Sequence, residues 1–191
     1  METLTAIASR RSMRQFKSDP IPEEVLASIL NAACQAPSGK NRQPWRFVII
    51  KEDQRPEMIR ILREGIARMK AAGDDLGSSE WSTTVMGQAP ISVFVFNPDG
   101  LFPWLAHSIS QNFIELVDTQ SIGAAIQNML LAATDLGLGS LWICDVFCAY
   151  EELCKWLGEK GQLIAAVSFG YPDDHPAARP RKPMVEVVRV K

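Results

Sequence analysis

The segment DTQSIGAAIQNMLLAATDLGLGS, from Asp118 to Ser140, constrains the fold most, because it predicts a helix that is apolar around much of its circumference. Apolar residues recur at helical spacing from Ile122 to Ala133, and alanine and leucine occupy much of the remaining surface. Such a helix has to be covered on several sides, so we expect it at the centre of the protein. Gly137 is expected to end it in the left-handed conformation.

The composition is that of an ordinary globular protein, with 47% hydrophobic and 22% charged residues in a chain of 191. No linker-like stretch or internal repeat divides the sequence, so we expect residues 1–191 to form a single domain. A formal net charge of −2 argues against a nucleic-acid-binding protein. No apolar run approaches the roughly 20 residues that span a bilayer, so we expect no membrane association.

The N-terminus places an arginine pair after a short amphipathic stretch, which is the wrong order for a secretory signal. The four cysteines lie in or beside apolar segments of a medium-sized chain, whereas disulfide frameworks belong to small secreted domains. We therefore expect reduced thiols, a cytoplasmic protein, and core positions for Cys144, Cys148 and Cys154.

Helix-like and strand-like segments alternate along the chain, which favours an α+β sandwich of helices around one sheet. Helical patterns cover residues 2–10, 22–34 and 149–160, and a polar helix-forming region between Asp53 and Gly87 has breaks at Gly73 and Gly77. The strand-like runs are short and rich in β-branched and aromatic residues. They are residues 46–50, 91–96, 141–147, 163–170 and 185–190.

The stretch SRRSMRQF follows the first helix and is expected to be extended. Alternate side chains of an extended chain share a face, so Arg10, Ser12 and Arg14 point one way and Arg11 the other. Two guanidinium groups that flank a hydroxyl suit a phosphate monoester. A solvated basic turn, paired with surface carboxylates, is the alternative.

A second basic group lies near the C-terminus, in the stretch ARPRKP. Arg179 and Arg181 alternate across a proline in a segment that has to be extended, so they present two charges on one side. This pair strengthens the phosphate interpretation only if it comes close to the first group. Otherwise it belongs to an exposed tail.

The loop APSGKNRQPW connects a predicted helix to a predicted strand. Pro37 and Gly39 turn the chain out of the helix, and Ser38, Asn41 and Gln43 offer short donors and acceptors beside an accessible backbone. Such a loop is suited to approach a planar heteroaromatic ring closely. A plain connection would explain the proline and glycine but not the amide side chains.

Several common active-site patterns are missing from the sequence. The two histidines, His107 and His175, have no cysteine or carboxylate at ligand spacing, so we expect no metal site. LGLGSLW follows a helix and leads into a strand, which is the reverse of a dinucleotide-binding fingerprint. No nucleophile elbow or Ser/His/Asp set is present, and we assign no catalytic side chain.

Four motifs in this order, RRSMRQF, APSGKNRQPWRFVI, DTQSIGAAIQNMLLAATDLGLGSLWI and FGYP followed by RPRKP, resemble the nitroreductase family of FMN-dependent oxidoreductases. The resemblance covers nearly the whole chain and is weakest over 53–87 and 97–110. It implies a nitroreductase-like α+β sandwich of helices around a central mixed, mostly antiparallel sheet. It also implies an intertwined homodimer with two FMN sites in the subunit interface.

The resemblance also implies which residues bind FMN. The phosphate and ribityl end would be held by the two basic groups, the APSGKNRQPW loop would reach the flavin of the other subunit, and the start of a strand would lie behind the ring. Cys144 and Asp145 stand where relatives often have Gly or Glu-Gly, so the contact to the flavin N5 is left open. The implied set is Arg10, Arg11, Ser12, Arg14, Pro37, Ser38, Gly39, Asn41, Gln43, Trp142, Ile143, Arg179 and Arg181.

The family's chemistry needs no acid–base pair, because hydride passes from NAD(P)H to FMN and then to an acceptor. We expect a small organic acceptor, such as a nitroaromatic or a quinone. The aromatic segment 97–112 is expected to be either a lid on the pocket or a dimer contact. Dehalogenase-like and flavin-cleaving family members are alternatives, as is a cofactor-free dimeric interaction protein that retains the fold.

Overall fold

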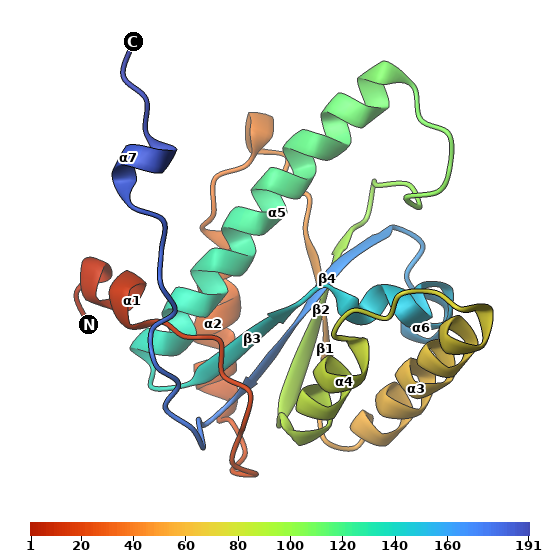
Figure 1. Ribbon diagram of the computed structural model, residues 1–191, viewed down its shortest axis with the longest axis horizontal. Helices are drawn as coiled ribbons and strands as arrows, with labels where there is room; N and C mark the ends of the chain where they lie inside the picture. The colour runs from red at the N-terminus through yellow and green to blue at the C-terminus, as the bar shows by residue number, and fades with distance from the viewer.

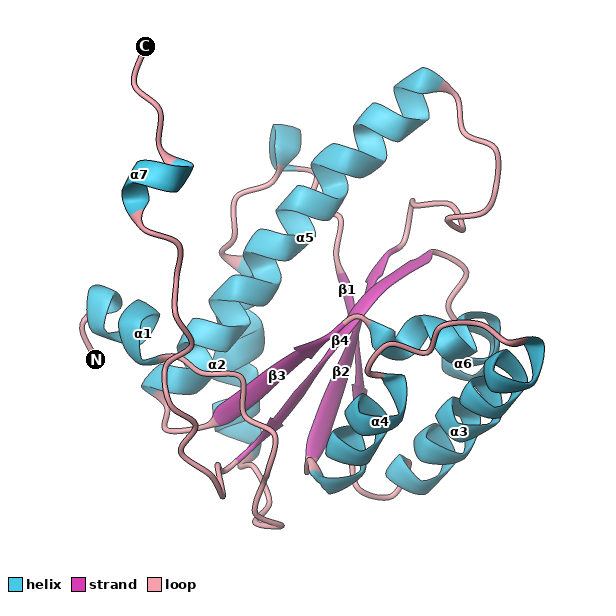
Figure 2. Ribbon diagram, viewed as in Figure 1, coloured by secondary structure: helices cyan, strands magenta, loops and turns pink.

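The computed structural model describes all residues, Met1–Lys191, and contains one four-stranded antiparallel sheet between two groups of helices (Figures 1 and 2). The strands follow the order β1-β2-β4-β3, so the two edge strands are β1 and β3. Their bounds are β1 Arg46–Ile50, β2 Ile91–Asn97, β3 Gly139–Ile143 and β4 Gln162–Gly170.

Each face of the sheet is covered by its own helices (Figure 1). One side carries α2 Glu23–Cys34 and α5 Ile109–Asp135, with α1 Thr3–Ser9 against α5. The other side carries α3 Arg55–Ala72, α4 Ser79–Gln88 and α6 Tyr150–Leu157. None of these helices combines the length and the apolar character that crossing a membrane requires. The short helix α7, Met184–Val187, lies outside both layers on a C-terminal arm.

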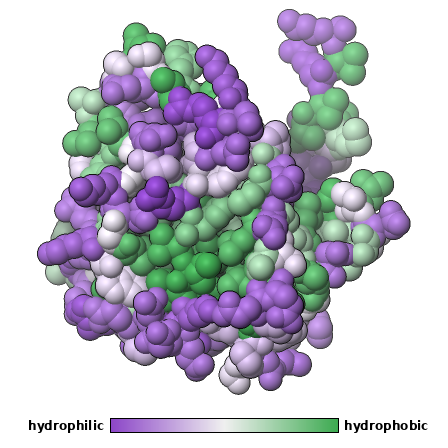
Figure 3. All heavy atoms as spheres, turned by 180° about the vertical axis from the view of Figure 1, so that it is seen from behind, coloured by the Kyte–Doolittle hydropathy of each residue, from purple (hydrophilic) through white to green (hydrophobic).

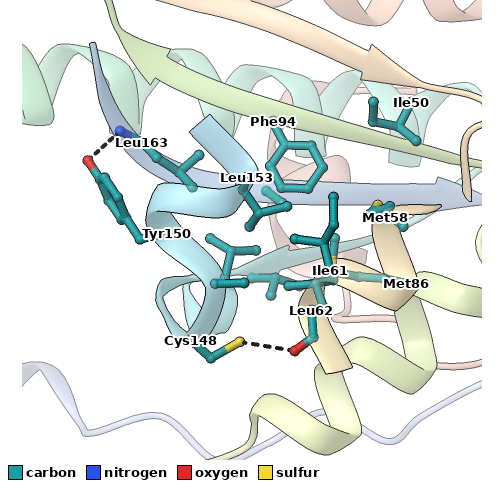
Figure 4. Packing of buried hydrophobic residues seen from close by; sticks show 14 of the residues in the cluster. Ile50, Met58, Ile61, Leu62, Met86, Phe94, Cys148, Tyr150, Leu153 and Leu163 are labelled. Atoms are coloured by element: carbon teal, nitrogen blue, oxygen red, sulfur yellow. Dashed lines mark hydrogen bonds between the residues drawn. The ribbon is translucent and has the colours of Figure 1, made fainter. Parts of the chain in front are cut away.

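The alternating side chains of the central strand β2 feed two separate hydrophobic cores. Val93 and Val95 pack with α2 and α5, and Phe94 and Phe96 pack with α3, α4 and α6. Figure 4 shows the second core, where the Leu163 amide donates a hydrogen bond of 2.7 Å to the Tyr150 hydroxyl. This bond satisfies a buried hydroxyl and ties α6 to β4. These observations confirm the predicted α+β sandwich.

The central helix is confirmed as α5, and Gly137 follows it with φ of 77°. The helix begins at Ile109, well before the predicted start near Asp118. Ser108 explains the difference, because its hydroxyl accepts from the Gln111 amide while the Gln111 side chain accepts from the Ser108 amide. Such a capping box satisfies free amides at the first turn.

Two of the predicted strands that lie on the C-terminal side of the central helix and one predicted core cysteine differ from the structure as follows. The predicted strand 141–147 ends at Ile143, because Asp145–Ala149 form a 3₁₀ helix that is bound to the start of α4. The predicted strand 185–190 forms no sheet pairing within the chain and lies on the exposed arm. Cys144 is exposed, whereas Cys148 and Cys154 are buried as expected; all the cysteines are free thiols.

A substitution at Gly65 tests how tightly α3 packs against the 3₁₀ helix Asp145–Ala149. A Cβ atom at this position would lie 2.3 Å from the Cys148 carbonyl oxygen, so Gly65→Ala is expected to destabilise the protein by about 1–3 kcal/mol. Gly87→Ala in α4 is the matched control. Its Cβ would meet Ile59 at an ordinary 3.6 Å, so helix propensity should make it neutral or stabilising by about 0.5–1 kcal/mol. Urea unfolding measures both, and equal effects would contradict the packing.

Candidate functional site: an arginine cleft

The segment after α1 crosses the end of the sheet and pairs with two parts of the chain. The Met13 amide donates to the Ser140 carbonyl at 2.9 Å, which places the segment along the edge of β3. Farther on, the Lys17 amide donates to the Tyr171 carbonyl at 2.9 Å, and the Asp173 amide donates to the Gln15 carbonyl at 3.0 Å. Residues 10–17 therefore lie between β3 and the loop that follows β4.

Two glycines make room for this crossing. A Cβ on Gly139 would lie 2.7 Å from Cγ of Met13, and one on Gly170 would lie 2.9 Å from the Phe16 ring. Larger residues at these positions would push the N-terminal segment away from the sheet. The two glycines thus allow the N-terminal segment, which carries the arginines, to lie close against the end of the sheet.

The crossing brings the two predicted basic groups together. They line an open cavity of about 280 Å³, which we call the arginine cleft. None of the arginines that line the cleft forms an ion pair, so these guanidinium groups are free of carboxylate partners. The lining residues are Arg10, Arg11, Ser12, Arg14, Pro176, Ala177, Arg179 and Arg181. The prediction that Arg11 points away from Arg10 and Arg14 was wrong, because Arg11 lines the same cavity.

Like charges face one another in the arginine cleft. Burial lowers the pKa of Arg10, and repulsion from Arg181 and Arg11 lowers it further. Arg11 donates to the carbonyls of Ala8 and Arg10 at 2.7 and 2.8 Å, so backbone dipoles orient its guanidinium. A cavity that gathers unpaired guanidinium groups around a hydroxyl is complementary to a multiply charged anion such as a phosphate monoester.

The APSGKNRQPW loop adopts a backbone that side-chain-bearing residues rarely take. Lys40, Asn41 and Gln43 have φ values of 53°, 55° and 51°. The Gly39 amide donates to the Ser121 hydroxyl at 3.2 Å, and a Cβ on Gly39 would lie only 2.3 Å from Val117. The loop is therefore clamped against α5 in a left-handed conformation. Runs of this kind concentrate at functional sites.

A buried carboxylate completes the clamp. Arg42 donates to Asp118 of α5 at 3.2 Å, and the Asp118 side chain is 1% exposed. Burial raises the pKa of Asp118 above its usual 3.8, and the Arg42 guanidinium acts in the opposite direction. The ion pair between Arg42 and Asp118 therefore holds the loop in place, although burial of the carboxylate costs desolvation free energy.

This raised pKa predicts a pH dependence of stability. The folded state binds the Asp118 proton more tightly than the unfolded state, so ionisation above a pH of about 4 subtracts from stability. Thermal stability of the wild type should fall relative to Asp118→Asn as the pH increases from about 4 to 7. Arg42→Gln should steepen the fall, because the opposing cation is gone. Thermal unfolding at a series of pH values checks this, and a constant difference between wild type and Asp118→Asn would contradict it.

The loop and the arginine cleft lie toward opposite ends of α5. The loop contacts Asp118 and Ser121, whereas α1 meets the far end, where the N-terminal amine pairs with Asp135. Residues 118 and 135 are separated by about 25 Å along a helix axis. One chain thus does not bring these two groups of predicted site residues together, and no loop residue lines the cleft.

The third predicted group lies on β3. The backbone groups of Ser140 face the N-terminal segment. Because the backbone groups of every second residue in an edge strand point the same way, those of Trp142 face the same open edge of β3. Trp142 is 38% exposed, so its ring is accessible. Ile143 is 2% exposed and packs in the core, and the same alternation turns its backbone groups toward β4, so the structure does not place Ile143 at the open edge.

The aromatic segment 97–112 packs on its own subunit, away from the arginine cleft. Phe102 and Trp104 surround Tyr150 of α6 with edge-to-face contacts at ring distances of 5.3 and 5.0 Å. Trp104 remains 55% exposed. The segment is therefore anchored through α6 and carries an apolar outer surface.

Comparison with known proteins places the chain in a family. The family model described as the nitroreductase family matches residues 7–171, so the chain belongs to the nitroreductase family. An Archaeoglobus fulgidus protein with the provisional name NADH dehydrogenase/NAD(P)H nitroreductase is 30% identical over 91% of this chain and 87% of its own. FMN is the cofactor of this family.

Two specialised enzymes are about equally similar. The iodotyrosine deiodinase of Thermotoga neapolitana is 29% identical over 94% of this chain and 91% of its own. The 5,6-dimethylbenzimidazole synthase of Rhodospirillum rubrum is 29% identical over 87% of this chain and 81% of its own. Sequence identity therefore does not favour one reaction within the family.

Solved structures agree with the fold. A BluB-like flavoprotein of Clostridium difficile superimposes with a TM-score of 0.81 at 29% identity, covering 100% of this chain and 99% of its own. A nitroreductase-type protein of Desulfovibrio desulfuricans, solved with FMN, gives a TM-score of 0.76 at 27% identity and covers 100% and 97%. The predicted family and its fold are thus confirmed.

Proposed function

We propose that the protein is an FMN-dependent oxidoreductase that transfers hydride from NAD(P)H through FMN to a small organic acceptor, such as a nitroaromatic or a quinone. The arginine cleft carries this proposal. Five arginines converge there without a carboxylate partner, although the chain as a whole has a net charge of −2. Unpaired cations gathered in one cavity are explained by an anionic ligand and disfavour a cofactor-free interaction protein.

The residues of the cleft fit the phosphate end of FMN. Arg10, Arg14 and Arg181 would supply charge-assisted hydrogen bonds to the phosphate oxygens, and the Ser12 hydroxyl adds a neutral donor. The open edge at Trp142 offers a backbone donor and acceptor for the polar edge of the ring. Bound FMN supplies the redox chemistry, so the protein has to bind, orient and exclude water rather than provide a nucleophile.

We propose further that the active form is a homodimer in which each site combines the arginine cleft of one subunit with the APSGKNRQPW loop of the other. The separation of these groups along α5 supports this arrangement. Apolar side chains are exposed on the first half of α5 at Ile109 and Phe113, and on the C-terminal arm at Val185 and Val190. Figure 3, which shows the molecule from behind, has an apolar area that hydrophilic residues surround. Exposed apolar surface of this extent is typical of subunit interfaces.

A specialised flavin reaction is the second candidate, because the deiodinase and the synthase are nearly as similar to this chain as the reductase-type relative. Such reactions would use the same cleft and differ in the groups that face the acceptor.

The visible absorption spectrum of the purified protein tests the proposal. A flavin spectrum, with FMN released at one per chain on denaturation, is the expected result. A second experiment reduces the bound flavin with NADH or NADPH and then adds nitroaromatics or quinones. Rapid reoxidation by these acceptors distinguishes a general reductase from a specialised enzyme. A colourless protein that does not take up added FMN would overturn the proposed function.

A further inference from the structure

One carboxylate holds the start of α4 against the 3₁₀ helix that follows β3. The hydroxyls of Ser78 and Ser82 both donate to the same oxygen of Asp145, each at 2.6 Å. The Ser79 hydroxyl also donates to the Asp145 backbone carbonyl at 3.4 Å. The first turn of α4 is therefore held in a fixed position against this 3₁₀ helix.

Trp81 lies on this fastened turn and contacts the arginine cleft. The guanidinium carbon of Arg14 lies 4.9 Å from the centre of the Trp81 ring, which is the geometry of a cation–π contact. The only hydrogen bond that Arg14 donates within the chain goes to the Ser12 carbonyl at 2.8 Å. Trp81 is 46% exposed, so packing in the core does not account for a tryptophan at this position.

We propose that Trp81 is a positioning residue that holds Arg14 ready for an anion in the arginine cleft, and that Asp145 holds Trp81 in turn. This inference rests on the proposed binding of the FMN phosphate in the cleft. A carboxylate would also restrain Arg14, but it would neutralise the guanidinium and compete with the phosphate. An aromatic face attracts the cation without cancelling its charge or occupying its N–H donors. It thereby lowers the entropy that binding has to remove.

The test compares FMN dissociation constants from flavin fluorescence titrations. Trp81→Leu should weaken FMN binding by about threefold to tenfold, and Trp81→Phe should restore part of the loss because a ring remains. Trp104→Leu is the matched control, since it removes another exposed tryptophan that contacts Phe102 and Tyr150 instead. It should leave FMN binding unchanged. Thermal unfolding of each variant separates misfolding from a local effect.

A double-mutant cycle identifies the partner. In an Arg14→Met background, Trp81→Leu should cause no further loss of affinity, because the contact no longer exists. Equal FMN affinities for wild type and Trp81→Leu, or equal losses in both backgrounds, would overturn the inference. An increased KM for the acceptor with unchanged FMN affinity would also overturn it and place Trp81 against the acceptor.

The same variants distinguish this inference from the proposed function. If the wild type does not bind FMN, the proposed function fails, and inorganic phosphate becomes the probe. Phosphate should then raise the thermal midpoint of the wild type more than that of Trp81→Leu. No phosphate effect on either protein would overturn both proposals.

Discussion

The double substitution Arg10→Ala/Arg181→Ala is expected to weaken FMN binding by about 100-fold or more, because each substitution removes a charge-assisted hydrogen bond that contributes roughly 1.5–3 kcal/mol. No buried carboxylate loses a partner, since neither arginine forms an ion pair in the folded chain. The cofactor-free variant should therefore be as stable as the wild type, or more stable because repulsion at Arg10 is relieved. Flavin fluorescence titration and thermal unfolding of the cofactor-free proteins measure the two effects.

The control for this variant removes the same charge elsewhere. Arg60→Ala/Arg63→Ala acts on the exposed surface of α3, where Arg60 pairs with Glu57 and Glu64. Exposed pairs of this kind contribute little, so both affinity and stability should change slightly. Stoichiometric FMN in the Arg10/Arg181 variant would contradict the assignment of the phosphate site.

The largest effect that depends on subunit arrangement is complementation between two defective proteins. We expect the loop variant Asn41→Ala/Gln43→Ala and the cleft variant Arg10→Ala/Arg181→Ala each to bind FMN poorly as homodimers. In a heterodimer, one site receives both defects and the other receives none. Co-expression in equal amounts should therefore restore about a quarter of all sites, since about half of the dimers are mixed.

Purification through two different affinity tags isolates the mixed dimer, in which FMN should reach one per dimer. A co-expressed pair that binds no more FMN than the separate variants would show that each cleft is served by the loop of its own chain. Two cleft variants carrying different tags provide the control, because their mixed dimers contain no intact site.

The arginine cleft could be predicted from the sequence because its two halves each follow a local rule. Alternation in an extended chain places Arg10 and Arg14 on one face and pairs Arg179 with Arg181, and these rules do not depend on distant residues. Their meeting in one cavity could not be derived this way. It depends on backbone pairing of the N-terminal segment with Ser140 and Tyr171, far along the chain.

Other elements escaped prediction for identifiable reasons. The early start of α5 depends on Ser108 and Gln111, whose capping pattern lies next to a proline-containing stretch that does not itself have a helical pattern. Residues 185–190 have the composition of a strand, but a strand needs a partner, and a single chain supplies none here. Trp81 gave no signal, because its environment is created by Asp145 and Arg14 from other parts of the sequence.

The repulsion among the arginines has a consequence for the lifetime of the protein. A ligand that binds only the folded state stabilises it in proportion to the logarithm of its concentration relative to the dissociation constant. Under the proposed function, FMN also relieves the unfavourable charge at Arg10, so the empty protein is the form most exposed to unfolding and proteolysis. The supply of flavin would then determine how much of this protein persists in a cell as well as how much of it is active.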